Sequence, residues 1–343
     1  MGTPELDHSL SSETIRLAYQ LFVGREPESE QMIQHALTYR TVERLRTAFF
    51  RSPEFRGICQ SELRLAAPPP PPAQPVAVPA PAKRVPLDAP PLTIEWRTDE
   101  ATAAALLAHV RDTWTRLGIE QPHWSVLSSD QFRPDRIEAN EAAFFASGGN
   151  DLAQLLAILR RNGVAPATLP RAFEFGCGIG RVTAHLARAF REVTVCDVSA
   201  SHMAIAQDKV YDSGARNLAF HLADSAEFGM AAPFDLWFSR IVLQHNPPPI
   251  IAMILRRAFA LLAPGGIALF QVPTYAAGYG FNIAAYLAGL GGEGQIEMHV
   301  LPQPVVFQLA REAGCETLEV LEDSSAGPAS HWNSSIFVMR KAA

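Results

Sequence analysis

Five short apolar runs alternate with helix-length stretches between residues 171 and 273 of this 343-residue chain. The runs are RAFEFG, EVTVCDV, LAFHLAD, FDLWFSRIV and GGIALFQV. Such alternation is typical of parallel strands joined by helices that cross over a sheet. Two later runs, ETLEVLED and SSIFVMRK, have no helix-length pattern between them, so we expect them to pair antiparallel. The sequence therefore predicts an α/β fold with a doubly wound, mostly parallel seven-stranded sheet.

A proline-rich stretch separates this region from the N-terminal part of the chain. Residues 67–91 contain 11 prolines in 25 residues. Proline fixes φ and lacks an N–H donor, so we expect an extended, semi-rigid spacer here. We therefore predict a small all-α domain over residues 1–64, a linker over 65–92 and an α/β domain over 93–343. Within the α/β domain, residues 93–165 should form a helical extension and residues 166–343 the core.

Start and stop signals predict five helices outside the sheet region. They are expected over residues 12–24, 29–37, 41–52, 98–118 and 151–163. Ser12 and Thr98 are candidate N-caps, and Gly118 is a candidate stop.

Composition limits the class of protein. A net charge of -6 does not favour binding to a nucleic-acid backbone. No run of 18 apolar residues predicts a membrane span, and the first residues lack the pattern of a signal peptide, so a cytoplasmic location is expected. The four cysteines and ten histidines show no zinc-like spacing. We therefore predict no metal site and an organic cofactor.

The stretch FEFGCGIGRVTAH, residues 173–185, places three glycines at alternate positions directly after the first strand. The dinucleotide fingerprint GxGxxG would need glycine at position 181 or 183, which Arg181 and Thr183 occupy. The GK[ST] sequence of a phosphate-binding loop is absent from this turn. The spacing is GxGxG, preceded by an acid. The helix that follows is expected to bury Val182, Leu186 and Ala189 against the sheet.

This turn, together with CDVS at the end of the next strand, resembles the class I S-adenosylmethionine-dependent methyltransferases. Matches to the family follow one another in order over residues 171–273. The resemblance implies a Rossmann-like methyltransferase sheet and S-adenosyl-L-methionine as the cofactor. The methionine tail of that cofactor carries an ammonium, which Glu174 can meet, whereas a pyrophosphate would favour bare N–H groups. Asp197, 17 residues after Gly180, can accept hydrogen bonds from both ribose hydroxyls.

The resemblance also assigns the remaining contacts to the cofactor. Val198 and Met203 are candidates to pack on the adenine, although core packing explains Met203 equally well. Asp224 is a candidate to bind the adenine amino group, with a helix N-cap as the alternative role. The predicted cofactor-binding residues are Glu174, Gly176, Cys177, Gly178, Gly180, Asp197, Val198, Met203, Asp224, Ser225 and Ser239.

Two stretches in the N-terminal region, LFVGREP and FFRSPEF, resemble a small helical module similar to phycobilisome-linker repeats. Such modules are often attached to bacterial enzymes of surface-glycan metabolism. The resemblance implies a protein partner for residues 1–64 and names no chemistry.

A hydroxyl acceptor of a methyl group must lose its proton, so a base is expected near the end of the fourth strand. His245 is the first candidate and His299 the second, with structural roles as the alternative for both. Residues 274–303 are expected to form an insertion that covers the acceptor. The leading hypothesis is O-methylation of a sugar or surface-glycan precursor. The alternatives are a methyltransferase for a lipid, a quinone or a natural product, and a non-catalytic assembly protein on a cofactor-binding scaffold.

Overall fold

The computed structural model describes residues 10–58, 84–290 and 296–343. The chain divides into two compact units, Met1–Ala80 and Pro81–Ala343. Most of the predicted linker over 65–92, and Cys59, lie outside the described residues. Its last part, residues 84–92, belongs to the second unit: Val85 N–H donates to the Ala329 carbonyl and Arg84 pairs with Glu322.

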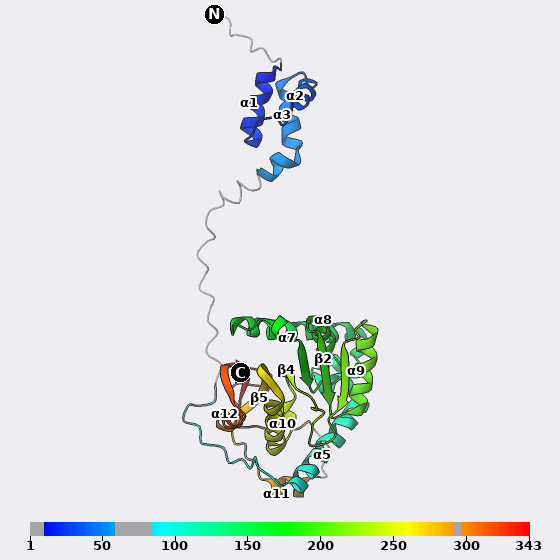
Figure 1. The fold of residues 1–343 in the computed structure, drawn as a ribbon. Coiled ribbons are helices and arrows are strands. Elements are labelled where there is room, and N and C mark those ends of the chain that lie inside the picture. The colour runs from blue at the N-terminus through cyan, green and yellow to red at the C-terminus, as the bar shows by residue number, and fades with distance from the viewer. Residues whose placement is uncertain (1–9, 59–83, 291–295) are drawn as a thin grey trace, which may run out of the picture. The chain divides into compact units, whose positions relative to one another are not determined.

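The described residues of the first unit, 10–58, form helices and their connections, as predicted. It contains α1 (Ser12–Val23), α2 (Glu30–Leu37) and α3 (Val42–Arg51) (Figure 1). Ser11, and not Ser12, caps α1, because its hydroxyl accepts from the Thr14 N–H. Its core is formed by the buried side chains Ile15, Ile33, Leu45 and Phe49.

The second unit is built on a seven-stranded sheet of order β3-β2-β1-β4-β5-β7-β6. Its strands are β1 (Arg171–Phe175), β2 (Glu192–Asp197), β3 (Leu218–Leu222), β4 (Phe234–Ser239), β5 (Leu262–Ala276), β6 (Cys315–Asp323) and β7 (Trp332–Lys341). Strands β1 to β5 pair in parallel, and β7 pairs antiparallel with both β5 and β6. The predicted doubly wound, mostly parallel sheet is therefore confirmed, including the antiparallel pair at its end.

Helices cover both faces of this sheet. One face packs against α5 (Glu100–Glu120), α10 (Pro248–Leu261) and α12 (Gln303–Glu312). The other packs against α7 (Glu141–Arg161), α8 (Thr183–Ala189) and α9 (Ala200–Asp212). The shorter helices are α6 (Pro122–Val126), α11 (Ile283–Gly289), η1 (Asp130–Phe132), η2 (Ile137–Ala139), η3 (Pro166–Thr168) and η4 (Leu243–His245). This arrangement leaves the carboxyl ends of β1, β2 and β4 free to build a site.

In the second unit, three helix predictions were wrong in detail. Asp99, and not Thr98, caps α5, and the helix continues through Gly118 to Glu120. On α8, Ala189 is exposed and Ala187 is buried in its place.

The third error is the start of α7, which lies ten residues before the predicted position 151. The pair Gly148-Gly149 interrupts the helical pattern in sequence. In the structure a Cβ on Gly148 would collide with the carbonyl oxygen of Arg181, so glycine lets α7 pack closely against the residues after the glycine turn. Among the described residues, α7 is also the helix whose length and composition would allow a membrane crossing. Its Phe144, Leu155 and Leu159 are buried inside the second unit.

Candidate functional site

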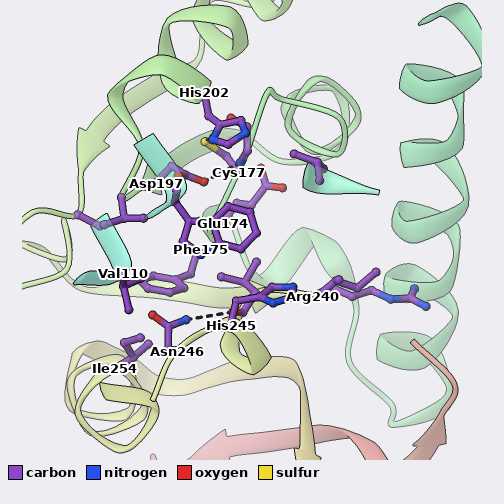
Figure 2. Close-up of a pocket in the computed structure, with 18 of the residues that line it drawn as sticks. Val110, Glu174, Phe175, Cys177, Asp197, His202, Arg240, His245, Asn246 and Ile254 are labelled. Atoms are coloured by element: carbon purple, nitrogen blue, oxygen red, sulfur yellow. Dashed lines mark hydrogen bonds between the residues drawn. The ribbon is translucent and has the colours of Figure 1, made fainter. Parts of the chain in front are cut away.

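A cleft lies at the carboxyl ends of β1, β2 and β4, where the glycine turn, α5 and α6 face one another. It encloses about 950 Å³ of space free of protein atoms, its open mouth included. We call one end the turn end, lined by Glu174, Gly176, Cys177, Gly178, Asp197 and Val198, and the other the far end, lined by Leu107, Val110, His245, Asn246 and Ile254. Figure 2 shows Glu174 and Asp197 well separated from Val110, Asn246 and Ile254.

The glycine turn is shaped by backbone conformations that other residues rarely adopt. Gly176 and Gly178 have φ values of +79° and +53°. The Gly176 N–H donates to the Cys196 carbonyl at 2.9 Å, which ties the turn to β2. A Cβ on Gly178 would lie 2.7 Å from Val126, so the absence of a side chain keeps this end of the cleft open. The turn therefore fits a ligand that approaches the backbone closely.

Gly180 was predicted as a cofactor contact, and the structure gives it a different position. It does not line the cleft. With φ +85°, it faces α9, where an added Cβ would lie 3.2 Å from both Ala206 Cα and a Val210 methyl carbon. Gly180 therefore allows the end of the turn to pack against α9.

Glu174 is a buried acid at the turn end of the cleft. It is 4% exposed, and its Oε2 accepts a hydrogen bond from the Thr183 hydroxyl at 2.6 Å. Burial raises the pKa of Glu174 to about 7, against the lowering effects of the Thr183 hydrogen bond and the positive charge of Arg181. A ligand cation next to Glu174 would favour its ionised form, so the residue fits the ammonium of the predicted cofactor.

Asp197 sits at the end of β2 and holds the turn in place. Its Oδ2 accepts from the Gly178 N–H at 2.8 Å and its Oδ1 from the Ser199 N–H at 2.9 Å. Each carboxylate oxygen can accept a second hydrogen bond. Asp197 can therefore both orient the turn and bind ribose hydroxyls, and Val198 lines the cleft beside it.

The structure does not bring four of the other predicted cofactor residues to the cleft. Met203 is buried in the core between α9 and the sheet, which matches core packing, the alternative role given for it. Asp224 and Ser225 are exposed beyond β3, and the neighbouring Ala223 lines the cleft instead. Ser239 is fully buried and donates to the Phe175 carbonyl at 3.1 Å, so it joins β4 to β1.

The two candidate bases have different surroundings. His245 lines the far end and contacts Trp114, with 5.0 Å between the ring centroids. Burial lowers the pKa of His245 to about 4, although a hydrogen bond to the Glu297 carbonyl acts in the opposite direction. His245 is therefore neutral at pH 7.

His299 does not line the cleft and is only 5% exposed. Its Nδ1 bonds to the Tyr279 hydroxyl at 2.9 Å and its Nε2 to the Glu297 carboxylate at 3.1 Å. The Glu297 carboxylate also accepts from Tyr286 and is 3.3 Å from His109 Nε2. Both ring nitrogens of His299 thus have hydrogen-bond partners. The cluster joins α5 to the predicted insertion, residues 274–303, which contains α11.

Sequence reasoning missed the contribution of α5 to the cleft. Leu107, Val110 and Trp114, spaced three and four residues apart, line it from one side of this helix. This spacing is the ordinary pattern of a helix that packs on a core, so the sequence alone could not distinguish a cleft wall from core packing. Ser125, Val126 and His202 were missed for a related reason, because tertiary packing brings them to the turn end.

Two arginines in the cleft lining share one buried carboxylate. Arg181 bonds to Asp151 Oδ2 at 2.5 Å, and Arg240 bonds to Asp151 Oδ1 at 2.6 Å. Arg240 also donates to Gln154 and lies 3.8 Å from Asp323. Their charges are therefore largely neutralised by α7 and β6, outside the cleft.

The chain is similar to known proteins over part of its length. Residues 172–266 match a family model described as a methyltransferase domain. They contain the glycine turn, Asp197 and His245, and the domain implies S-adenosylmethionine as the cofactor.

Curated relatives match parts of the chain. It is 38% identical over 111 residues to trans-aconitate 2-methyltransferase of Methylobacterium radiotolerans, which is 32% of this chain and 40% of the relative. It is 28% identical over 164 residues to the ubiquinone biosynthesis O-methyltransferase of Aromatoleum aromaticum, 44% of this chain and 66% of the relative. The chain thus spans less than two thirds of the length of either relative.

Among solved structures, magnesium protoporphyrin IX methyltransferase from Synechocystis with bound S-adenosylhomocysteine is similar with a TM-score of 0.49 and 16% identity. The alignment covers 69% of this chain and 99% of that one.

Proposed function

We propose that the whole chain is an S-adenosylmethionine-dependent O-methyltransferase that acts on the hydroxyl group of a small molecule. The observation that carries the proposal is that one cleft combines four features. They are the buried acid Glu174, an open glycine turn, Asp197 at the end of β2, which can bind ribose hydroxyls, and the neutral His245. Glu174, the turn and Asp197 would hold the cofactor at the turn end. The bound sulfonium supplies an activated methyl group. The acceptor would then lie at the far end, next to His245.

The residues of the far end suit the deprotonation of a hydroxyl group. The bound cofactor would give up this methyl group with its thioether as the leaving group, so the far end would have to hold the acceptor oxygen in line with the methyl group. Orientation and exclusion of water supply much of the rate, and the α5 side chains are placed to do both. His245, which carries no positive charge at pH 7, would take the hydroxyl proton and pass it to water. His299 is engaged on both nitrogens and is a weaker candidate.

The chemistry of the far end favours an acceptor with an uncharged, largely apolar body. Leu107, Val110 and Ile254 supply aliphatic surface, while His245 and Asn246 are neutral polar groups. The two arginines of the described lining are both bound to Asp151, so a multiply anionic acceptor would lack an unpaired cation there. These features support the lipid, quinone or natural-product alternative, in line with the similarity to a ubiquinone biosynthesis O-methyltransferase.

A sugar or surface-glycan precursor is the second candidate. It rests on the resemblance of residues 1–64 to a module found beside glycan enzymes, which is association and not mechanism. A cytoplasmic location and a protein partner for residues 1–64 are part of the same proposal.

Binding and turnover experiments test the two parts separately. Calorimetry should detect S-adenosylmethionine and its demethylated product binding to the full chain, and no binding of NADH. Transfer of labelled methyl should then be measured to a catechol with an alkyl tail, a sugar nucleotide and a tricarboxylate. We expect transfer to the catechol. Binding of NADH without either nucleoside would refute the assignment, and tight cofactor binding without transfer to any acceptor in a cell extract would favour the assembly protein.

A further inference from the structure

The backbone is strained directly after β4, at the mouth of the cleft. Ile241 has φ +58°, in the left-handed region that β-branched residues rarely occupy. Such conformations persist where the surrounding structure enforces them, and they concentrate at functional sites. Here the Ile241 N–H donates to Gln271 Oε1 at 3.0 Å. Gln271, a residue of β5, is therefore one group that stabilises the turn.

Gln271 is 1% exposed, and the direction of its amide is fixed by its partners. Its oxygen faces a backbone N–H, which can only donate. Its Nε2 donates to Gln244 Oε1 at 2.9 Å and to the Ser334 hydroxyl oxygen at 2.7 Å. The Ser334 hydroxyl in turn donates to Asp323 Oδ2. Every donor and the acceptor of the Gln271 side chain thus has a partner of the required kind.

The same chain of bonds continues to His245. Because Gln244 Oε1 accepts from Gln271, Gln244 presents its amino group to His245 Nε2, at 3.3 Å. On the other side of the ring, His245 Nδ1 lies 2.8 Å from the Glu297 carbonyl oxygen, which can only accept. Nδ1 must therefore carry the proton and Nε2 the lone pair.

A second proton on His245 would conflict with the hydrogen bonds that link His245 through Gln244 and Gln271 to Ile241. Protonated Nε2 would face an amino group, so Gln244 would have to turn its amide over, and Gln271 would have to follow. Gln271 Nε2 would then face the Ile241 N–H, donor against donor. The nearby titratable groups are His299, which disfavours a positive ring, and Glu297, whose carboxylate is bound to His299, Tyr286 and His109.

We propose that Gln244 and Gln271 are positioning residues that hold His245 as the neutral Nδ1–H tautomer, with the Nε2 lone pair available at the cleft. A substrate hydroxyl that donates to Nε2 would take the place of the Gln244 amino group. The catalytic consequence rests on the proposed function, whereas the tautomer itself does not.

Nitrogen-15 NMR of the full chain with labelled histidine tests the tautomer directly. The His245 signals are assigned by their loss in His245→Asn. In the parent protein we expect a protonated Nδ1 and an unprotonated Nε2 from pH 5.5 to pH 8. An Nε2–H tautomer, or an imidazolium in this range, would overturn the proposal whether or not the protein transfers methyl groups.

Gln271→Glu tests the part played by the two glutamines. A carboxylate can accept from Ile241 N–H but cannot donate to Gln244, so Gln244 should turn its amide over and offer Oε1 to His245 Nε2. We expect a protonated Nε2 at neutral pH and a kcat that is lower by roughly tenfold or more. In the pH profile of kcat, the decrease on the acid side should move toward neutral pH. Gln131→Glu makes the same change at an exposed position and should leave spectra and rates as in the parent. An unchanged His245 spectrum in a folded Gln271→Glu protein would refute the role of Gln271, and if that variant does not fold, the parent spectrum still decides the tautomer.

Discussion

The turn end and the far end of the cleft are assembled from very different lengths of chain. Residues 174–198 supply the acids and the glycines of the turn end, and Ser125, Val126 and His202 complete it. The far end combines α5 with two neighbouring segments, the residues after β4 and α10. These two segments follow α5 by more than a hundred positions in the sequence. The turn end is built from charge and backbone conformation, whereas the far end is built from apolar side chains and a neutral histidine. The comparison suggests that a local motif sets cofactor chemistry while distant packing sets acceptor chemistry.

The largest expected effect is on the turn end. Gly178→Arg places a side chain against Val126 in a left-handed backbone, so affinity for S-adenosylmethionine should fall by roughly 100-fold or more, measured by calorimetry. Gly163→Arg is the matched control, because Gly163 also has a positive φ but faces open space. Equal losses in the two variants would mean that backbone strain, and not the cleft, explains the result.

At the far end, His245→Gln should separate turnover from binding. We expect kcat to fall by roughly 100-fold, because general-base catalysis is lost, while cofactor affinity stays as in the parent. Steady-state rates and calorimetry measure the two quantities. His331→Gln, at an exposed position, is the control. A matching loss of cofactor affinity would show that the two ends are not independent.

The pH dependence of cofactor affinity should come from the turn end. Glu174 has its pKa raised to about 7 by burial, and a bound cation favours the ionised carboxylate. Affinity should therefore rise with pH, by about tenfold from pH 6 to pH 8, and level off above the pKa. Glu174→Gln should bind more weakly and lose this dependence. A dependence that persists in Glu174→Gln would assign it to another group.

The smallest expected effect concerns the wall formed by α5. Trp114→Leu removes the ring contact with His245, so the KM for the acceptor should rise by about three- to tenfold. Trp332→Leu changes the same residue type outside the cleft lining and should leave KM unchanged. A larger change in cofactor affinity than in acceptor KM would place Trp114 in the turn end.

The sequence predicted the parts of the site that depend on neighbouring residues. The alternating apolar runs gave the parallel strands, and the acid, the GxGxG spacing and the acid after β2 gave Glu174, Gly178 and Asp197. Other predicted cofactor contacts do not line the cleft. Asp224 and Ser239 lie outside the cleft lining, and Gly180 serves helix packing.

Taken by itself, the sequence determined the order of the strands in the chain, the shape of the turn and the charge that it presents. These features follow from side-chain periodicity and from the backbone freedom of glycine, which act over a few residues. Only the tertiary structure decided that α5 forms a wall of the cleft, that Gly148 lets α7 pack against Arg181, and that Gln271 is hydrogen-bonded to Gln244, the neighbour of His245. Each of these features depends on a contact between segments that are distant in the sequence. The spacing of apolar residues or a single glutamine does not show which distant residue it will contact.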